Sequence, residues 1–200
     1  MKHLDKREFF SSDEKFANFR SLILNNKKSK MFFRSASATR NIYGRMETVN
    51  KIMRNKSIKT TIDLTYIEYR CFSDEFGYEL VNQFCKILAE EGPYVIQCDS
   101  GKKRTGFASI VLEMLSGTNY SLIVQDYIES YVNNNGVSVI DDCDVVEKIR
   151  KQKIDRIIQF ISGAKESILE TNFVKSAELY LLKYGFDEYE ILKLHKKLKQ

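Results

Sequence analysis

Hydrophobic residues in the first half of the chain follow two alternating patterns. Short runs of β-branched and aromatic residues predict strands, and longer stretches with apolar residues three or four positions apart predict helices. The predicted strands are residues 29–35, 58–64 and 93–97, and the predicted helices that separate them are residues 43–57 and 74–92. The polar run 25–30 reads as an exposed turn before the first strand. This alternation of strands and helices favours a parallel α/β sheet.

The second half of the chain changes to a helical pattern. Helices are predicted over residues 105–115, 119–132 and 144–161, and the C-terminal segment predicts a helical pair. In that pair, Gly185 is typical of a helix C-terminus, and Asp187 followed by Glu190 is typical of a capping box. We therefore expect an α/β fold with a small, mainly parallel sheet flanked by helices and a helix-rich C-terminal half.

Composition and charge limit the classes of protein that this chain can form. Of its 200 residues 43% are hydrophobic, which is enough for one sizeable core. Pro93 is the only proline and the nine glycines are dispersed, so no linker divides residues 1–200 and we expect one domain. The net charge of +5 is modest and no arginine block concentrates it, so we expect no nucleic-acid partner.

The sequence also bears on location and on metal binding. No apolar run approaches the length needed to cross a bilayer, and the charged first residues do not resemble a signal peptide. We expect a cytoplasmic monomer without stable membrane insertion, while export by a route without such a signal stays open. Four cysteines and two histidines, with no C-x-x-C pair, predict reduced thiols and no structural zinc.

The segment QCDSGKKRTG, residues 97–106, leads from the third predicted strand into an apolar helix. A loop between a strand end and a helix start exposes unpaired backbone N–H groups at the positive end of the helix dipole, which forms an anion site. Gly101 lets the backbone curl so that several N–H groups converge. Arg104 adds a planar guanidinium that can bind two oxygens, so the anion that suits this loop best is a tetrahedral phosphate.

Cys98 lies at the start of this loop, where the N–H groups and Arg104 would stabilise a thiolate nucleophile. Thr105 can donate its hydroxyl to the sulfur and help it leave as a thiolate. Cys98 and Arg104 form a C-x5-R element with a glycine inside, a strand before and a helix after, which is far more specific than C-x5-R alone. The alternative is a buried structural thiol beside a basic turn. A nucleotide-binding G-x-x-x-x-G-K-[ST] loop is rejected because its first glycine is missing.

The string CDSGKKRTG resembles the signature C-x-x-G-K-x-R-[TA]-G of cysteine-dependent tyrosine phosphatases. It is most similar to the compact bacterial tyrosine phosphatase family, which also includes dual-specificity and phosphoinositide-cleaving enzymes. Other strings share the likeness: FFRSAS resembles an arginine-serine strand of the family, IKTTIDL a strand ending in Asp-Leu, and GPYVIQC the strand that enters the loop. The resemblance covers most of residues 30–200.

The resemblance implies a role for each residue of the loop. Cys98 would attack phosphorus and form a phosphocysteine intermediate that water hydrolyses, and Arg104 would hold the phosphate. No metal and no cofactor is implied. The residues that would form the phosphate-binding cradle are Asp99, Ser100, Gly101, Lys102, Lys103, Arg104 and Thr105.

Two positions depart from the family pattern. Gln97 stands where a histidine usually precedes the nucleophile, and Lys103 stands where many relatives place an aspartate that can serve as general acid. General acid catalysis contributes about a hundredfold to ten-thousandfold, so another carboxylate is expected to replace it. Asp74 is our candidate, and its alternative is an N-cap of the following helix. Asp99 has a side chain that is free to point outward, and Asp63 is interpreted as a structural residue at a strand end.

Two further residues are candidates for a role near the cradle. Arg34, in the first predicted strand, is a candidate to reach the cradle, and the competing interpretation is a solvated or structural arginine. Cys71 precedes the Asp74 loop, so an oxidised Cys98 could be captured by it as a disulfide if that loop folds over the cradle.

The leading interpretation is a phosphomonoester hydrolase, specifically a protein tyrosine phosphatase that acts on phosphorylated proteins. Lys102 and Lys103 make the cradle cationic, which is also compatible with phosphoinositides. A rival from another class is a pseudophosphatase that binds phosphorylated partners without turnover, because Gln97 and Lys103 replace useful groups. Turnover that depends on Cys98 would separate the enzyme from the binding protein.

Overall fold

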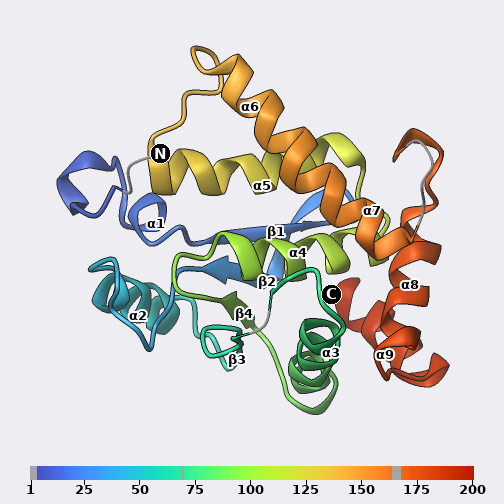
Figure 1. Cartoon of the computed structure of the whole chain (residues 1–200). Coiled ribbons are helices and arrows are strands. Elements are labelled where there is room, and N and C mark those ends of the chain that lie inside the picture. The colour runs from blue at the N-terminus through green and yellow to red at the C-terminus, as the bar shows by residue number, and fades with distance from the viewer. Residues whose placement is uncertain (1–3, 69, 164–167) are drawn as a thin grey trace.

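The computed structural model describes residues 4–68, 70–163 and 168–200, and within these ranges it contains a four-stranded sheet flanked by helices (Figure 1). The strands follow the order β1-β2-β4-β3. They comprise β1 Arg20–Leu24, β2 Lys27–Ser35, β3 Thr60–Asp63 and β4 Tyr94–Gln97. β2, β4 and β3 are parallel and β1 pairs antiparallel with β2. The predicted α/β fold with a mainly parallel sheet is confirmed.

The antiparallel edge strand β1 was not predicted. Residues 25–30 were expected to form an exposed turn, but only Asn25 and Asn26 turn, with φ of +50° and +63°, and β2 already begins at Lys27. Asparagine tolerates the left-handed region that a tight hairpin requires. The first predicted strand, residues 29–35, is therefore the last seven of the nine residues of β2, which forms a hairpin with β1.

The parallel strands end level with one another. Ser35 of β2 and Asp63 of β3 both pair with Gln97 of β4. The carboxyl ends of the three strands thus meet at one edge of the sheet, where ligands of open α/β sheets bind. The loops after β2, β3 and β4 all start at this edge.

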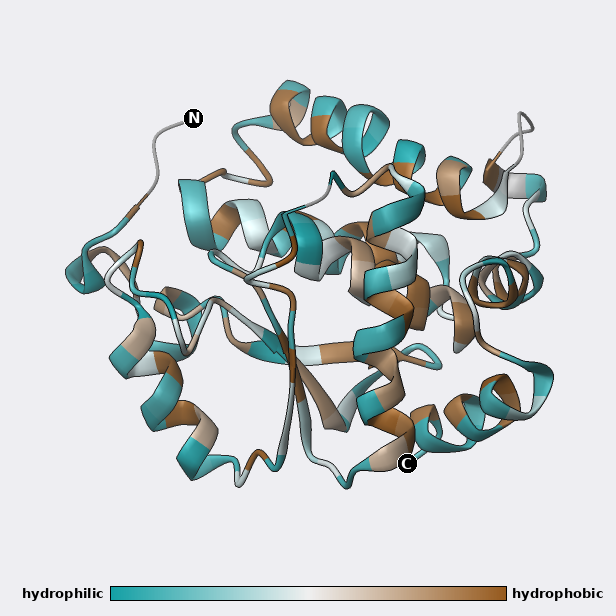
Figure 2. Cartoon of the chain, turned by 60° about the horizontal axis from the view of Figure 1, so that its bottom comes forward, coloured by the Kyte–Doolittle hydropathy of each residue, from teal (hydrophilic) through white to brown (hydrophobic). Residues whose placement is uncertain are grey.

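Helices cover both faces of the sheet. Those in the first part of the chain are a short α1 Asp13–Phe16, α2 Met46–Asn55, α3 Asp74–Ala89, α4 Lys103–Leu115 and α5 Tyr120–Asn135. Neighbouring side chains of a strand point to opposite faces, so Phe32 joins the large hydrophobic cluster and Phe33 joins a smaller one under α2. Figure 2 shows hydrophobic segments gathered at the centre and hydrophilic ones on the outer surfaces of the helices.

α4 is the most enclosed helix of the fold. Every residue from Thr105 to Leu115 is buried. A helix that is hydrophobic on all sides belongs in a core rather than at a surface. The loop that leads into α4 is therefore attached to the centre of the molecule.

The C-terminal half is helical, as predicted. α6 Cys143–Ile149, a π-helical segment Arg150–Asp155 and α7 Arg156–Ser162 follow one another almost without a break and cover the predicted helix 144–161 (Figure 1). After a short 3-10 turn Ile168–Glu170, the helical pair is α8 Phe173–Lys183 and α9 Glu188–Leu198. The capping box of Asp187 and Glu190 is present. In the described ranges, no helix combines the length and the apolar character needed to cross a membrane.

Candidate active site

The loop between β4 and α4 turns sharply at Gly101. Cys98 follows β4 directly and is 2% exposed, and Gly101 N donates to the Cys98 carbonyl at 3.0 Å. Gly101 has a φ of +65°, and a Cβ built on it would lie 2.3 Å from the carbonyl oxygen of Ser35 in β2. Glycine is therefore required here both by the positive φ and by the close approach to β2.

The carbonyl groups of this loop are bound from the β1–β2 side. Asn18 Nδ2 donates to the carbonyls of Ser100 at 3.1 Å and Gly101 at 3.0 Å, and Arg34 Nη2 donates to Gly101 O at 2.9 Å. The C=O and N–H of a trans peptide point in opposite directions, so the N–H groups of Gly101 and Lys102 point away from Asn18 and Arg34. The N–H of Gly101 is used by the Cys98 carbonyl, and within the described residues that of Lys102 remains for an anion. α4 also starts without a side-chain cap, which leaves its first N–H groups for an anion.

Arg34 is held in place by a buried network behind the loop. Asp126 of α5 accepts from Arg34 Nη1 and, at 2.7 Å, from Arg20 Nε, and Ser130 Oγ accepts from both arginines. Burial alone would raise the pKa of Asp126, but the charges of Arg20 and then Arg34 outweigh it and hold the pKa below its ordinary value. Arg34 is fully buried, so it is a structural and not a solvated arginine, and its bond to the Gly101 carbonyl shows that it also reaches the cradle from behind.

Glu113 of α4 lies beside this network. It is fully buried, and neither carboxyl oxygen has a hydrogen-bond partner among the described residues. Burial, and next the charge of Asp126, raise the pKa of Glu113 well above its ordinary value, which favours the neutral acid. The region behind the cradle thus contains both a permanently paired carboxylate and an unpaired carboxyl group.

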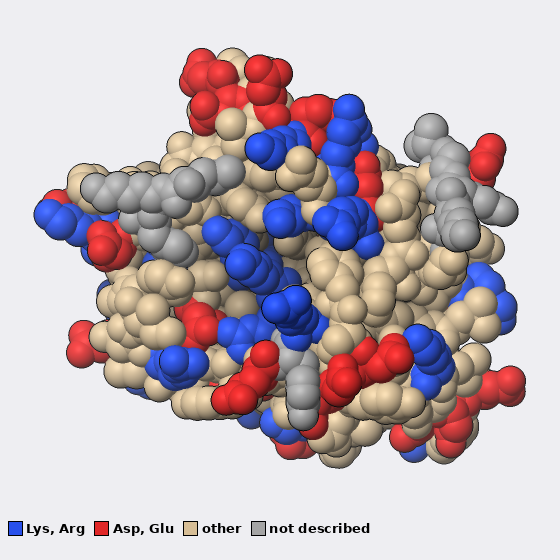
Figure 3. Space-filling view, in the orientation of Figure 1, with Lys and Arg blue, Asp and Glu red and all other residues tan. Residues whose placement is uncertain are grey.

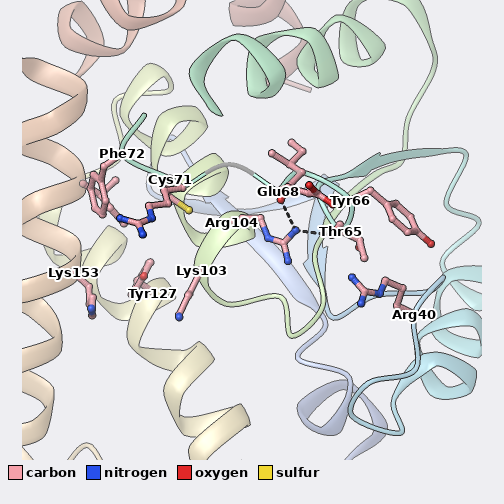
Figure 4. A pocket seen from close by; sticks show the side chains of 13 residues that line it. Arg40, Thr65, Tyr66, Glu68, Cys71, Phe72, Lys103, Arg104, Tyr127 and Lys153 are labelled. Atoms are coloured by element: carbon pink, nitrogen blue, oxygen red, sulfur yellow. Dashed lines mark hydrogen bonds between the residues drawn. The ribbon is translucent and has the colours of Figure 1, made fainter. Parts of the chain in front are cut away.

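Arg104 faces the opposite side of the loop. Its Nη1 donates to the carbonyl oxygens of Leu64 at 2.7 Å, Thr65 at 2.5 Å and Ile67 at 2.9 Å, all in the loop between β3 and α3. Figure 4 shows the bonds to the pocket-lining residues Thr65 and Ile67. Its Nη2 donates to Asp99 Oδ2 at 2.5 Å. Within the described residues no acceptor binds Nε, so Nε and the second N–H of Nη2 remain for a phosphate.

Asp99 turns its carboxylate toward two arginines. Oδ2 accepts from Arg104, and Oδ1 lies 3.4 Å from Arg40 Nη1. The side chain is 20% exposed and does not point outward into solvent. Asp99 therefore orients the guanidinium of Arg104 and offsets part of the positive charge.

The other cradle residues differ in where their side chains lie. Lys102 Nζ donates to Asn135 Oδ1 at 2.8 Å and lies over the ring of Tyr131; burial first, and next the charge of Lys103, lower its pKa to about 8. Lys103 is exposed and lines a pocket. Thr105 Oγ1 is buried without a hydrogen-bond partner in the described chain, so the expected bond to the sulfur of Cys98 is not present.

A pocket of about 680 Å³ opens beside the cradle, next to the first turn of α4. The aromatic residues of its wall are Tyr66, Phe72 and Tyr127, and its cations are Arg40, Arg70, Lys103, Arg104 and Lys153 (Figure 4). Glu68 is the carboxylate among its lining residues. Figure 3 shows Lys and Arg side chains gathered in a band across the middle of this face. The pocket therefore suits an anionic ligand with an aromatic part.

Asp74 lies outside this pocket. It is the first residue of α3, and Ser73 is the N-cap, since Ser73 Oγ accepts from Phe76 N at 3.2 Å; the N-cap interpretation of Asp74 is therefore wrong. Asp74 Oδ1 accepts from Lys183 Nζ at 2.9 Å, at the end of α8, and from the OH of the next residue, Tyr184, at 2.6 Å. These bonds, that of Tyr184 first, lower the pKa of Asp74 and hold it ionised. The structure does not bring Asp74 to the cradle, and nothing in these contacts supports it as the acid.

Three other residues from the sequence analysis are placed as follows. Asp63 is structural, as interpreted, since it accepts from Thr65 N at 2.9 Å and Thr39 Oγ1 at 3.2 Å. Gln97 is buried with Oε1 bound to Ala38 N at 3.1 Å, so it supports the loop after β2. Cys71 lines the pocket, and burial first raises its pKa to about 11.

The fold and the loop together define a class of protein. A parallel strand ends in a buried cysteine, a glycine-dependent turn follows, and a buried helix begins with an arginine; this is an α/β protein with an anion cradle between strand and helix. A family model described as the tyrosine phosphatase family matches residues 45–200, and the chain belongs to this family. No curated protein matches the chain. The family supports phosphatase activity on phosphorylated substrates.

Proposed function

We propose that the chain is a cysteine-dependent protein tyrosine phosphatase that uses Cys98 as its nucleophile. The observation that carries this proposal is the cradle itself. The carbonyls of Ser100 and Gly101 are bound from one side by Asn18 and Arg34, so the N–H of Lys102, the uncapped first N–H groups of α4 and Arg104 are available for a phosphate above Cys98. Donors fixed before the substrate arrives stabilise a developing negative charge without reorganisation.

The proposed reaction has two steps. Cys98 Sγ attacks phosphorus, the S–P bond forms and the bond to the leaving oxygen breaks, and this oxygen takes up a proton. Water then attacks phosphorus, the S–P bond breaks, and the thiolate returns to Cys98. Arg104 would bind two equatorial oxygens through N–H groups that it does not use in the structure. The buried hydroxyl of Thr105, which has no partner in the described chain, is available to the departing sulfur.

Phosphotyrosine is the substrate that the pocket favours. A volume of about 680 Å³ with the rings of Tyr66, Phe72 and Tyr127 in its wall can accommodate an aromatic ring. The pocket's five cations favour acidic groups around the phosphate, and they also support phosphoinositides as a second candidate. We further propose a monomeric single domain over residues 1–200 that works in the cytoplasm.

The experiment that tests the function is phosphate release from a phosphotyrosine peptide. Wild type should turn over, Cys98→Ser should not, and Cys85→Ser is the matched control because Cys85 is an exposed free thiol on α3. A folded wild-type protein that binds vanadate without releasing phosphate would instead identify a pseudophosphatase. Release of phosphate from a soluble phosphoinositide, and not from the peptide, would favour the second candidate.

A further inference from the structure

The proposed reaction needs a proton at the leaving oxygen. The acid expected within the loop is missing, and the other carboxylates considered from the sequence are bound to other residues. Lys103 stands directly before Arg104, where an acid would be expected. Asp74 is bound to α8, and Asp63 is bound to Thr39 and Thr65. Asp99 is bound to Arg104 at 2.5 Å and lies 3.4 Å from Arg40, so both of its carboxyl oxygens face arginines. None of these three carboxylates is in a position to donate the proton.

Glu68 is different because it lines the pocket. It is exposed, it belongs to the loop between β3 and α3, and it is the carboxylate that this part of the described chain contributes to the pocket wall. Figure 4 shows it beside Arg104 at the pocket rim. In an in-line displacement the leaving oxygen lies on the side of phosphorus opposite to the sulfur, so its proton must come from the pocket side and not from behind the loop.

The position of Glu68 is linked to the phosphate clamp. The carbonyls of Leu64, Thr65 and Ile67 all accept from Arg104 Nη1, and Glu68 is the next residue along the chain. A loop that is bound to the guanidinium at three points keeps its register with any phosphate that the guanidinium holds. Glu68 is thereby held at a defined position relative to the phosphate, as efficient catalysis by a nearby group requires.

The surroundings of Glu68 are mixed in charge. On the pocket side lie Arg40, Arg70, Lys103 and Arg104. On the other side a second hollow is lined by Glu68 together with Asp63, Glu79 and Lys86. Glu68 therefore lies between a cationic pocket and a hollow with acidic side chains. Glu79 lines only the hollow, so it serves as a control glutamate outside the pocket.

We propose that Glu68 is the general acid and base of the reaction. This rests on the proposed function. In the first step its carboxyl proton passes to the leaving oxygen as the P–O bond breaks and the S–P bond forms. In the second step its carboxylate takes a proton from the water that attacks phosphorus, and Cys98 leaves as thiolate. The sum of both steps is phosphomonoester plus water giving alcohol plus phosphate, with Glu68 protonated again.

The test compares two leaving groups. Glu68→Gln should lower the rate of the first step, measured as the pre-steady-state burst of the leaving group, by about a hundredfold or more on a phosphotyrosine peptide, since the phenolate of tyrosine needs protonation. The burst rate on para-nitrophenyl phosphate should change little, because nitrophenolate leaves without a proton, whereas the second step slows equally on both substrates. Glu68→Asp should keep part of the lost activity, and Glu79→Gln should behave as wild type on both substrates. Thermal unfolding of each variant verifies the fold.

The outcomes are distinct. A loss of burst rate confined to the peptide supports Glu68 as the acid. No loss of burst rate, or an equal loss of it on both substrates, overturns the role while leaving the proposed function intact, and a selective loss in Asp99→Asn with Glu68→Gln unaffected would transfer the role to Asp99. A wild-type protein without Cys98-dependent turnover overturns the proposed function, and the role of Glu68 with it.

Discussion

Two arginines meet the cradle from opposite sides, and their environments differ. Arg34, behind the loop, has a side chain that is 0% exposed and pairs with the carboxylate of Asp126, also buried. Arg104, in front, is 19% exposed, and three of its four acceptors are neutral carbonyls of another loop. The positive charge of Arg34 is thus neutralised by a carboxylate, whereas Arg104 is held mainly by hydrogen bonds to uncharged backbone carbonyls.

This difference separates a structural part of the site from a part that can bind a ligand. A guanidinium can bind a phosphate through two parallel charge-assisted hydrogen bonds. A phosphate can therefore bind the unused N–H groups of Arg104, but it has no access to the buried Arg34. We infer that the rear network fixes the loop during folding and that the front arginine binds the ligand, and four variants test this division.

Asp126→Asn should have the largest effect, on stability. It leaves Arg20 and Arg34 buried without their counter-charge, and breaking a buried ion pair costs about 3–5 kcal/mol. Urea unfolding measures this loss, and Glu129→Gln on the same helix should change little. A loss below about 1 kcal/mol would show that the rear network is not structural.

Arg104→Lys should affect activity more than stability. The ammonium keeps the charge but loses the planar fork, so kcat/KM on a phosphotyrosine peptide should fall about a hundredfold to a thousandfold, as for loss of one oxyanion donor. Arg40→Lys is the control, because Arg40 has a 3.4 Å contact with Asp99 and is 43% exposed. Equal activity losses in both variants would contradict the special place of Arg104.

Gly101→Ala tests the turn where the two regions meet. The alanine would have to keep the positive φ of Gly101, and its Cβ would lie 2.3 Å from the Ser35 carbonyl oxygen. We therefore expect the free energy of unfolding to fall by about 1–3 kcal/mol and the cradle to be distorted. Gly163→Ala is a matched control, since Gly163 has the same φ of +65° with nothing within 4 Å. Equal losses in urea unfolding would mean that the φ alone matters and the contact with β2 does not.

Glu113→Gln should give the smallest effect, visible as a pH dependence. A carboxyl group whose pKa is raised on folding favours the folded state fully below its unfolded pKa, about 4.3, and this contribution is lost as pH rises through the folded pKa. The difference in stability between the variant and wild type should therefore grow in favour of glutamine from acidic to neutral pH. Parallel pH profiles would show that Glu113 keeps an ordinary environment.

The sequence predicted the parts of the site that depend on local order. The Cys98 to Arg104 spacing, the turn at Gly101 and the strand and helix on either side all follow from neighbouring residues. Asn18 and Asp126 could not be found in the same way, because they bind partners 83 and 92 positions away, Gly101 and Arg34. Such contacts depend on how strands and helices pack, which no short motif encodes.

The placements that the sequence did not anticipate have the same origin. Asp74 follows the loop between β3 and α3, but it binds Tyr184, which lies 110 positions later and directly after α8. The strand β1 was missed because five residues with two buried side chains give little periodic signal, and only its pairing with β2 defines it. Glu68 carries no motif either, and it stands out only once the pocket brings it next to Arg104.

The support behind the cradle also affects how this chain can be shortened. The family match begins at residue 45, so a fragment cut there would keep the complete signature from Cys98 to Gly106. It would lose β1 and β2, half of the strands, and with them Asn18, Arg20 and Arg34. The motif by which the protein is recognised and the residues that give this motif its shape therefore belong to different segments of the chain, and only both together form the cradle.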